Sequence, residues 1–131
     1  MNTSFETPRE PTPRPEVRLD DSGWAVVTLF GEQDCATAAQ SIQALKDAHA
    51  LAAGRVIADL TEVTFAGAAL LASLVHTLRL ARRQPGGTVT VVSTDRRLAA
   101  KMRITGLDRV LPIYATLEDA LQAVTASPKT Q

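Results

Sequence analysis

The sequence predicts one α/β domain, a mixed β-sheet of about five strands with about four helices packed mainly on one face. Three observations support this. Arg55 to Leu60 contains a short apolar run of the kind that a strand buried on both faces needs. From Gly67 to Ala81 apolar residues recur at steps of three and four, which indicates an amphipathic helix. The 131 residues, 45% of them hydrophobic, suffice for one core and are too few for two domains.

The N-terminus predicts a disordered tail over residues 1–15. This segment holds prolines at positions 8, 11, 13 and 15, and Phe5 is its one large apolar residue. It therefore cannot bury enough surface to offset the entropy of ordering. We place the domain at residues 16–126 and expect a frayed C-terminus over 127–131.

The first two strands are expected to form a hairpin. Glu16 to Asp20 alternates in polarity, and Trp24 to Phe30 is rich in β-forming residues. The residues at 20–23, Asp-Asp-Ser-Gly, have the chemistry of a tight turn. These strands should pair antiparallel at one side of the sheet.

A helix should follow this hairpin. Gly31 to Asp34 ends the second strand, and Asp34 is a good N-cap for a helix over Ala36 to Ala53. Gly54 can end the helix in the left-handed conformation. The predicted core side comprises Ala39, Ile42, Leu45 and Ala52.

The central unit is a strand, a turn and a helix. The strand over Val56 to Leu60 should end where the turn over Thr61 to Ala66 crosses its carboxyl end, and the helix should begin at Gly67 to Ala69. In open α/β sheets, partners meet the crevice outside the strand ends, and a helix N-terminus there has unpaired N–H groups. A functional loop is therefore expected at Phe65 to Leu70.

Four further elements follow the turn at 85–87. They are a strand near a sheet edge over Thr88–Ser93, a short helix capped by Thr94 or Asp95 and ending at Arg103, an edge strand over Val110–Ile113 and a helix over Thr116–Ala126. Leu98 and Met102 should face the core from the short helix. Thr116 and Asp119 have capping-box spacing at the start of the last helix.

Composition limits the class of partner. The chain has 14 Lys and Arg against 14 Asp and Glu, so no net field attracts it to nucleic acid or an anionic membrane. No apolar run approaches the roughly 20 residues that span a bilayer. The single cysteine, Cys35, excludes a disulfide within the chain and favours a reducing, cytoplasmic setting. We expect a protein partner or a small neutral ligand.

The sequence favours a binding module over an enzyme. His49 and His76 lie on different predicted helices without the spacing of metal ligands, so no metal or other cofactor is predicted. Ser73 and His76 stand three residues apart, but no nucleophile elbow precedes them. No dinucleotide-binding glycine motif follows a strand.

Three segments together resemble the STAS domain, found in sulfate transporters and in bacterial anti-sigma factor antagonists. They are the D-L-x-x-V-x-F-like segment Asp59 to Phe65, the G-E-L-D-like Gly31 to Asp34, and TGLDRVLPIYATLEDAL at Thr105 to Leu121. The resemblance extends from about Val17 to Val124. It implies a protein-binding regulatory module that engages an anti-sigma factor or a related serine kinase-like protein in partner switching.

The chain departs from the family where its switch should lie. Relatives typically open the second helix with Asp-Ser-Ser/Thr-Gly, whereas this chain has Gly67, Ala68, Ala69 and Leu70. The resemblance implies that Ala68 occupies the position of the serine that partner kinases phosphorylate. Alanine has no oxygen to accept a phosphoryl group, so we predict no switching at position 68.

The predicted partner-binding residues lie in this loop and in the Gly31–Asp34 corner, which the resemblance places beside it. They are Glu32, Asp34, Phe65, Ala66, Gly67, Ala68, Ala69, Leu70 and Ser73. Exposed apolar clusters commonly mark contacts. Alternatively, Phe65 and Leu70 belong to the core, an interpretation favoured for Phe65 and open for Leu70. Glu32 and Asp34 could likewise serve only capping and turn formation.

Two other functions stay open. The chain could be a STAS accessory subunit of a lipid-transport ATPase or of a stress-signalling assembly, where the domain supplies an interface. It could also bind a small apolar ligand, or form a homodimer through the apolar loop.

Overall fold

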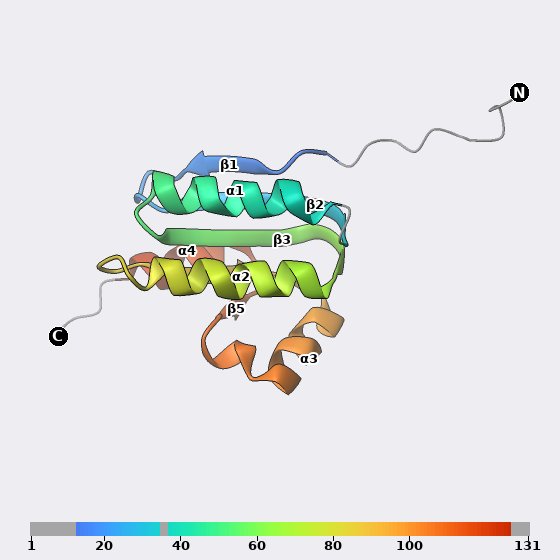
Figure 1. Cartoon of the computed structure of the whole chain (residues 1–131). Helices are drawn as coiled ribbons and strands as arrows, with labels where there is room; N and C mark the ends of the chain where they lie inside the picture. The colour runs from blue at the N-terminus through green and yellow to red at the C-terminus, as the bar shows by residue number, and fades with distance from the viewer. Residues whose placement is uncertain (1–12, 35–36, 127–131) are drawn as a thin grey trace, which may run out of the picture.

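The computed structural model describes residues 13–34 and 37–126, which form a five-stranded sheet in the order β1-β2-β3-β4-β5 (Figure 1). β1 pairs antiparallel with β2, and every other pair is parallel. The strands are β1 (Glu16–Leu19), β2 (Ala25–Gln33), β3 (Arg55–Ala66), β4 (Thr88–Val92) and β5 (Ile113–Tyr114). The helices are α1 (Ala38–Leu51), α2 (Ala68–Ala81), α3 (Arg96–Thr105) and α4 (Leu117–Thr125), with a 3-10 turn, η2 (Leu107–Arg109).

The predicted fold class is confirmed, because three helices share one face of the sheet. α1 and α2 lie side by side across that face, and α3 adds Leu98 and Met102 to the same core (Figure 1). α4 covers the opposite face with a smaller core around Trp24, Ile57 and Ala120. Parts of the Pro-rich tail (1–12), Cys35, Ala36 and the C-terminal 127–131 lie outside the described residues.

The burial of β3 on both faces explains why Val56, Ile57, Ala58 and Leu60 are apolar; the polar residue among them, Asp59, accepts hydrogen bonds from the Thr61 N–H and hydroxyl. Val56, Ala58 and Leu60 face the core under α1 and α2, whereas Ile57 faces α4. Successive side chains of a strand point to opposite sides, so a strand covered on both faces needs apolar residues facing each side.

The turn predicted over 61–66 is wrong, because β3 continues to Ala66. β2 ends at Gln33, within the predicted end at Gly31 to Asp34, and its last residues pair with the extension of β3, with Gly31 opposite Val63 and Gln33 opposite Ala66. The register shifts on either side of Gly31, which has a positive φ of 73°. This irregularity lets the pairing continue where sequence patterns suggest that it stops.

The predicted position of β4 near an edge of the sheet is confirmed, but its residues do not alternate between buried and exposed. β4 is buried on both faces and lies between β3 and the two-residue strand β5. The edge strand begins after Pro112, at Ile113, instead of at Val110. The carbonyl of Pro112 still accepts a hydrogen bond from the Val91 N–H at 2.8 Å. Proline lacks an N–H, which suits it to the end of an edge strand.

α1 begins later than predicted, with Thr37 as its N-cap residue and Ala38 as its first helical residue. The Asp34 carboxylate still accepts a hydrogen bond from the Thr37 N–H at 3.1 Å. Leu45 and Ala52 are buried as predicted and Ile42 is half-buried. Ala39 is exposed, and Ser41, Ala44 and Ala48 take the core side instead because the helix is turned about its axis relative to the prediction.

The predicted caps of α3 and α4 are confirmed, and the cap of α4 predicts a measurable loss of stability. Thr116 Oγ1 accepts a hydrogen bond from the Asp119 N–H at 3.0 Å. We expect Thr116→Ala to lower the free energy of unfolding by about 1 kcal/mol, since an N–H at the helix start loses its partner. Thr125→Ala is the matched control, because the Thr125 hydroxyl only donates back to the Leu121 carbonyl. Urea denaturation should separate the two variants, and equal losses would contradict the capping role.

Within residues 13–34 and 37–126, no helix combines the length and apolar character that crossing a membrane requires.

Candidate functional site

The candidate site lies at the carboxyl end of the sheet, where β2 and β3 stop and α2 starts. Glu32 pairs with Phe65 and Gln33 with Ala66 in the strand register. The Gly67 N–H then donates to the Gln33 carbonyl at 3.0 Å. The structure thus brings the Gly31–Asp34 corner and the loop at 65–69 together, as the resemblance implied.

Not every predicted residue is at the surface. Phe65 is 47% exposed, and Glu32, Asp34 and Ala68 are exposed, with Gly67 and Ala69 half-buried. Ala66, Leu70 and Ser73 are buried.

The core position favoured for Phe65 is therefore wrong, and Leu70, which was left open, is a core residue. The continuation of β3 explains the exchange. Ala66 faces the core at the end of the strand, so its neighbour Phe65 faces outward. Leu70, the third residue of α2, is buried in the same core as Ala66.

Gly67 lets the two segments approach closely. A Cβ at this position would lie 2.9 Å from the Gln33 carbonyl oxygen and 3.2 Å from the Phe65 ring. The first contact is with backbone that already accepts the Gly67 N–H, so it cannot move away cheaply. The aspartate typical of the family at this position would not fit here without a shift of the corner.

Buried polar contacts hold the corner in place. Gln33 is 2% exposed, and its side chain accepts from the Ser41 hydroxyl at 2.5 Å and donates to the Phe30 carbonyl at 2.8 Å. Thr37 Oγ1 donates to the Glu32 carbonyl at 2.6 Å. Because buried polar groups are costly to leave unpaired, these bonds fix the backbone that carries Glu32 and Asp34.

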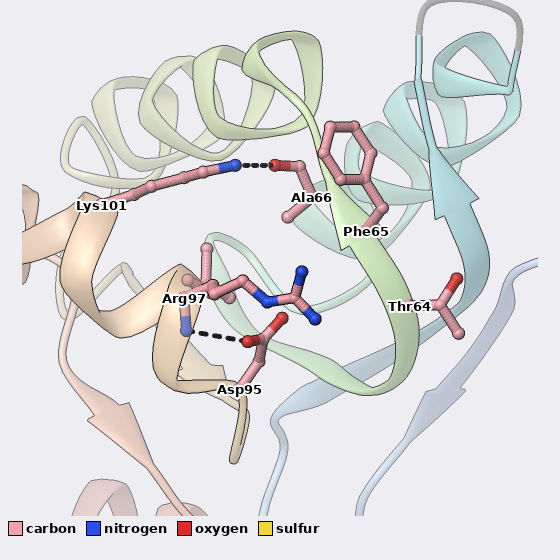
Figure 2. A pocket seen from close by; sticks show the side chains of 7 residues that line it. Thr64, Phe65, Ala66, Asp95, Arg97 and Lys101 are labelled. Carbon is pink, nitrogen blue, oxygen red and sulfur yellow. Dashed lines mark hydrogen bonds between the residues drawn. The ribbon is translucent and has the colours of Figure 1, made fainter.

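α3 contributes a residue that the sequence analysis did not select. Lys101 Nζ donates to the Ala66 carbonyl at 3.1 Å and lies 5.0 Å from the centroid of the Phe65 ring (Figure 2). The second distance is within the range of a cation–π contact. Lys101 therefore contacts the end of β3 from α3, although it follows Ala66 by 35 residues in the sequence.

A small hollow of about 60 Å³ lies between the end of β3 and the start of α3 (Figure 2). It is lined by Thr64, Phe65, Ala66, Asp95, Arg97, Leu98 and Lys101. Small-molecule sites usually measure about 300–1,000 Å³, so this hollow has room for the end of one side chain and not for a metabolite. A larger, open hollow of about 390 Å³ between β1 and α1 is lined mainly by Gln40, Gln43, Asp47 and Val17.

Among the residues that the structure describes, Ser73, His76 and His49 show no arrangement for catalysis. The Ser73 hydroxyl is buried and donates to the Leu70 carbonyl at 2.7 Å, while His76 is exposed. His49 is half-buried on α1, and its Nε2 has no hydrogen-bond partner. Across the part of the chain that the structure describes, no three His, Cys, Asp or Glu residues group as metal ligands.

The sequence and the structure both have close counterparts. The chain is 32% identical over 106 residues to "Anti-sigma-F factor antagonist RsfB" of Mycobacterium tuberculosis, covering 80% of this chain and 84% of that protein. It is 30% identical over 122 residues to "Anti-sigma-F factor antagonist RsfA" of the same organism, covering 92% and 94%. A crystal structure of an anti-sigma factor antagonist from Mycobacterium paratuberculosis has a TM-score of 0.70 and 33% identity, covering 84% of this chain and 92% of that one. The sequence model of the STAS domain matches residues 14–120. The chain therefore belongs to the STAS domain family.

Proposed function

We propose that this protein is an anti-sigma factor antagonist that binds an anti-sigma factor of the serine kinase-like type. It does so through a loop surface, which consists of Glu32, Asp34, Phe65, Gly67, Ala68 and Ala69. The observation that carries the proposal is the outward, half-exposed Phe65 beside the start of α2 in a chain whose relatives are named anti-sigma-F factor antagonists. Exposed aromatic side chains often serve as anchors in protein–protein contacts.

The binding is proposed to be free of the phosphorylation switch that the family resemblance implies. Ala68 is the first residue of α2 and is exposed, so a kinase would reach it but find no hydroxyl. Ser73, the remaining hydroxyl between residues 65 and 73, is 8% exposed and is engaged by the Leu70 carbonyl. The protein would then be competent to bind whenever it is present.

The proposal also assigns a place and a manner of action. It describes a cytoplasmic binding module with no catalytic activity of its own, consistent with the burial of Ser73 and the exposure of His76 on α2. A homodimer through the loop surface would compete with partner binding. Native mass spectrometry of the chain with and without partner therefore tests whether self-association accompanies the function.

Binding and phosphorylation assays test the proposal. Each purified anti-sigma factor encoded in the same genome is titrated against the full chain by calorimetry, and each mixture is then incubated with ATP. We expect at least one saturable 1:1 complex and no phosphate on this chain. Ala68→Ser supplies the missing hydroxyl and serves as the comparison.

Two results would overturn parts of the proposal. Absence of binding to every anti-sigma factor would refute the partner class, and copurification with an ATPase subunit would then favour the accessory-subunit alternative. Phosphate at Ser73 of the unaltered chain would refute the unswitched state.

A further inference from the structure

α3 is strongly basic in a chain that is neutral overall. Its ten residues include Arg96, Arg97, Lys101 and Arg103 and no carboxylate, against 14 basic and 14 acidic residues in the whole chain. The four cations are all exposed. A helix of this kind concentrates positive potential on one part of the surface.

One side of this helix combines charge with exposed apolar surface. Arg97, Lys101 and Ile104 are spaced by four and three residues, so they lie along one side of the helix. Ile104 is 82% exposed, and Leu98 and Met102 occupy the buried side. We call Arg97, Lys101 and Ile104 the α3 stripe.

The α3 stripe is continuous with the loop surface. Lys101 lies over the Phe65 ring and donates to the Ala66 carbonyl, and Ile104 follows it by three residues on the same side of α3. Figure 2 shows Arg97 and Lys101 both reaching from α3 towards the end of β3, on either side of the small hollow.

Arg97 lines that hollow together with Asp95 (Figure 2). Asp95 caps α3 by accepting from the Arg97 backbone N–H at 2.9 Å. Among the described residues, no carboxylate oxygen lies within 4.0 Å of the Arg97 guanidinium, and the one ion pair joins Arg18 to Asp20. Guanidinium groups favour bidentate pairing with carboxylates, and about 60 Å³ accommodates such a group.

We infer that the α3 stripe and Phe65 dock an acidic segment of the protein partner, with a partner carboxylate entering the hollow to pair with Arg97. Apolar partner side chains then cover Phe65 and Ile104. This inference rests on the proposed function and adds the chemistry of the partner's contact. Nucleic acid fits less well, because its phosphates would leave Phe65 and Ile104 uncovered and the chain has no net positive charge.

The test compares charge reversal at two adjacent arginines. Arg97→Glu and Arg96→Glu make the same change of net charge in the first turn of α3, and both side chains are exposed. Successive helical residues point about 100° apart, so only Arg97 lies in the α3 stripe. The probe is the purified anti-sigma factor that binds the unaltered chain, and circular dichroism melting checks that both variants are folded.

We expect Arg97→Glu to raise the Kd about 10-fold or more and Arg96→Glu to change it less than about twofold. Raising the salt from about 50 to 300 mM should weaken binding of the unaltered chain and have much less effect on Arg97→Glu. Ile104→Ser should raise the Kd without altering the salt dependence.

The outcomes separate the inference from the proposed function. If an anti-sigma factor binds but Arg97→Glu and Arg96→Glu have equal effects, the docking inference is wrong and the proposed function stands. Displacement of that factor by a 20-base-pair DNA duplex would also refute the inference. If no anti-sigma factor binds at all, both fall together.

Discussion

Replacement of Ala68 by glutamate is expected to weaken partner binding about 100-fold or more while leaving thermal stability unchanged or slightly raised. Ala68 is exposed at the first position of α2 and adjoins the half-exposed Phe65. A carboxylate there introduces an unpaired charge into a surface that the partner must desolvate, and such charges cost several kcal/mol at interfaces.

The effect on folding should have the opposite sign. α2 has no acidic residue in its first turn and no side-chain cap hydrogen bond. A glutamate at this end interacts favourably with the helix dipole, typically by about 0.3–1 kcal/mol. Loss of binding together with retained or increased stability would therefore locate the effect in the interface.

Two controls separate charge from size and from position. Ala68→Gln keeps the length of the side chain without its charge and should weaken binding less than glutamate does. Ala123→Glu places the same charge on an exposed position of α4, on the opposite face of the sheet, and should leave the Kd unaltered. Calorimetry measures the Kd of each variant, and circular dichroism measures its melting temperature. If Ala68→Glu bound the partner with an unchanged Kd, the start of α2 would not be part of the interface.

The fold could be predicted from the sequence because its signals are local. The apolar run of β3, the helical period of α2 and the caps at Asp95 and Thr116 each depend on residues within a few positions of one another. Turn residues at 20–23 likewise predicted the hairpin. There, hydrogen bonds from Ser22 lower the pKa of the Asp20 carboxyl and hold the turn.

The site was less predictable because contacts distant in sequence determine it. The length of β3 depends on its pairing with the extended β2, and this pairing decides that Phe65 faces outward and Ala66 inward. Lys101 donates a hydrogen bond to the Ala66 carbonyl, 35 residues away, and no sequence pattern near either residue predicts that contact. Sequence patterns did not single out Arg97, since its place at the hollow arises from the fold, which brings α3 beside the end of β3.

Leu70→Ala should have the largest effect on stability, lowering the free energy of unfolding by about 2–5 kcal/mol. Leu70 is completely buried on the side of α2 that faces the core. Truncation removes buried apolar surface, which stabilises the folded state, and leaves a cavity. Ile104→Ala removes a similar volume from a side chain that is 82% exposed and should cost less than about 0.5 kcal/mol. Urea denaturation measures both.

At temperatures where Leu70→Ala is folded, its Kd for the partner should stay near that of the unaltered chain, because Leu70 lies under the loop surface and outside the contact. A raised Kd with an unchanged free energy of unfolding would instead show that Leu70 contacts the partner directly.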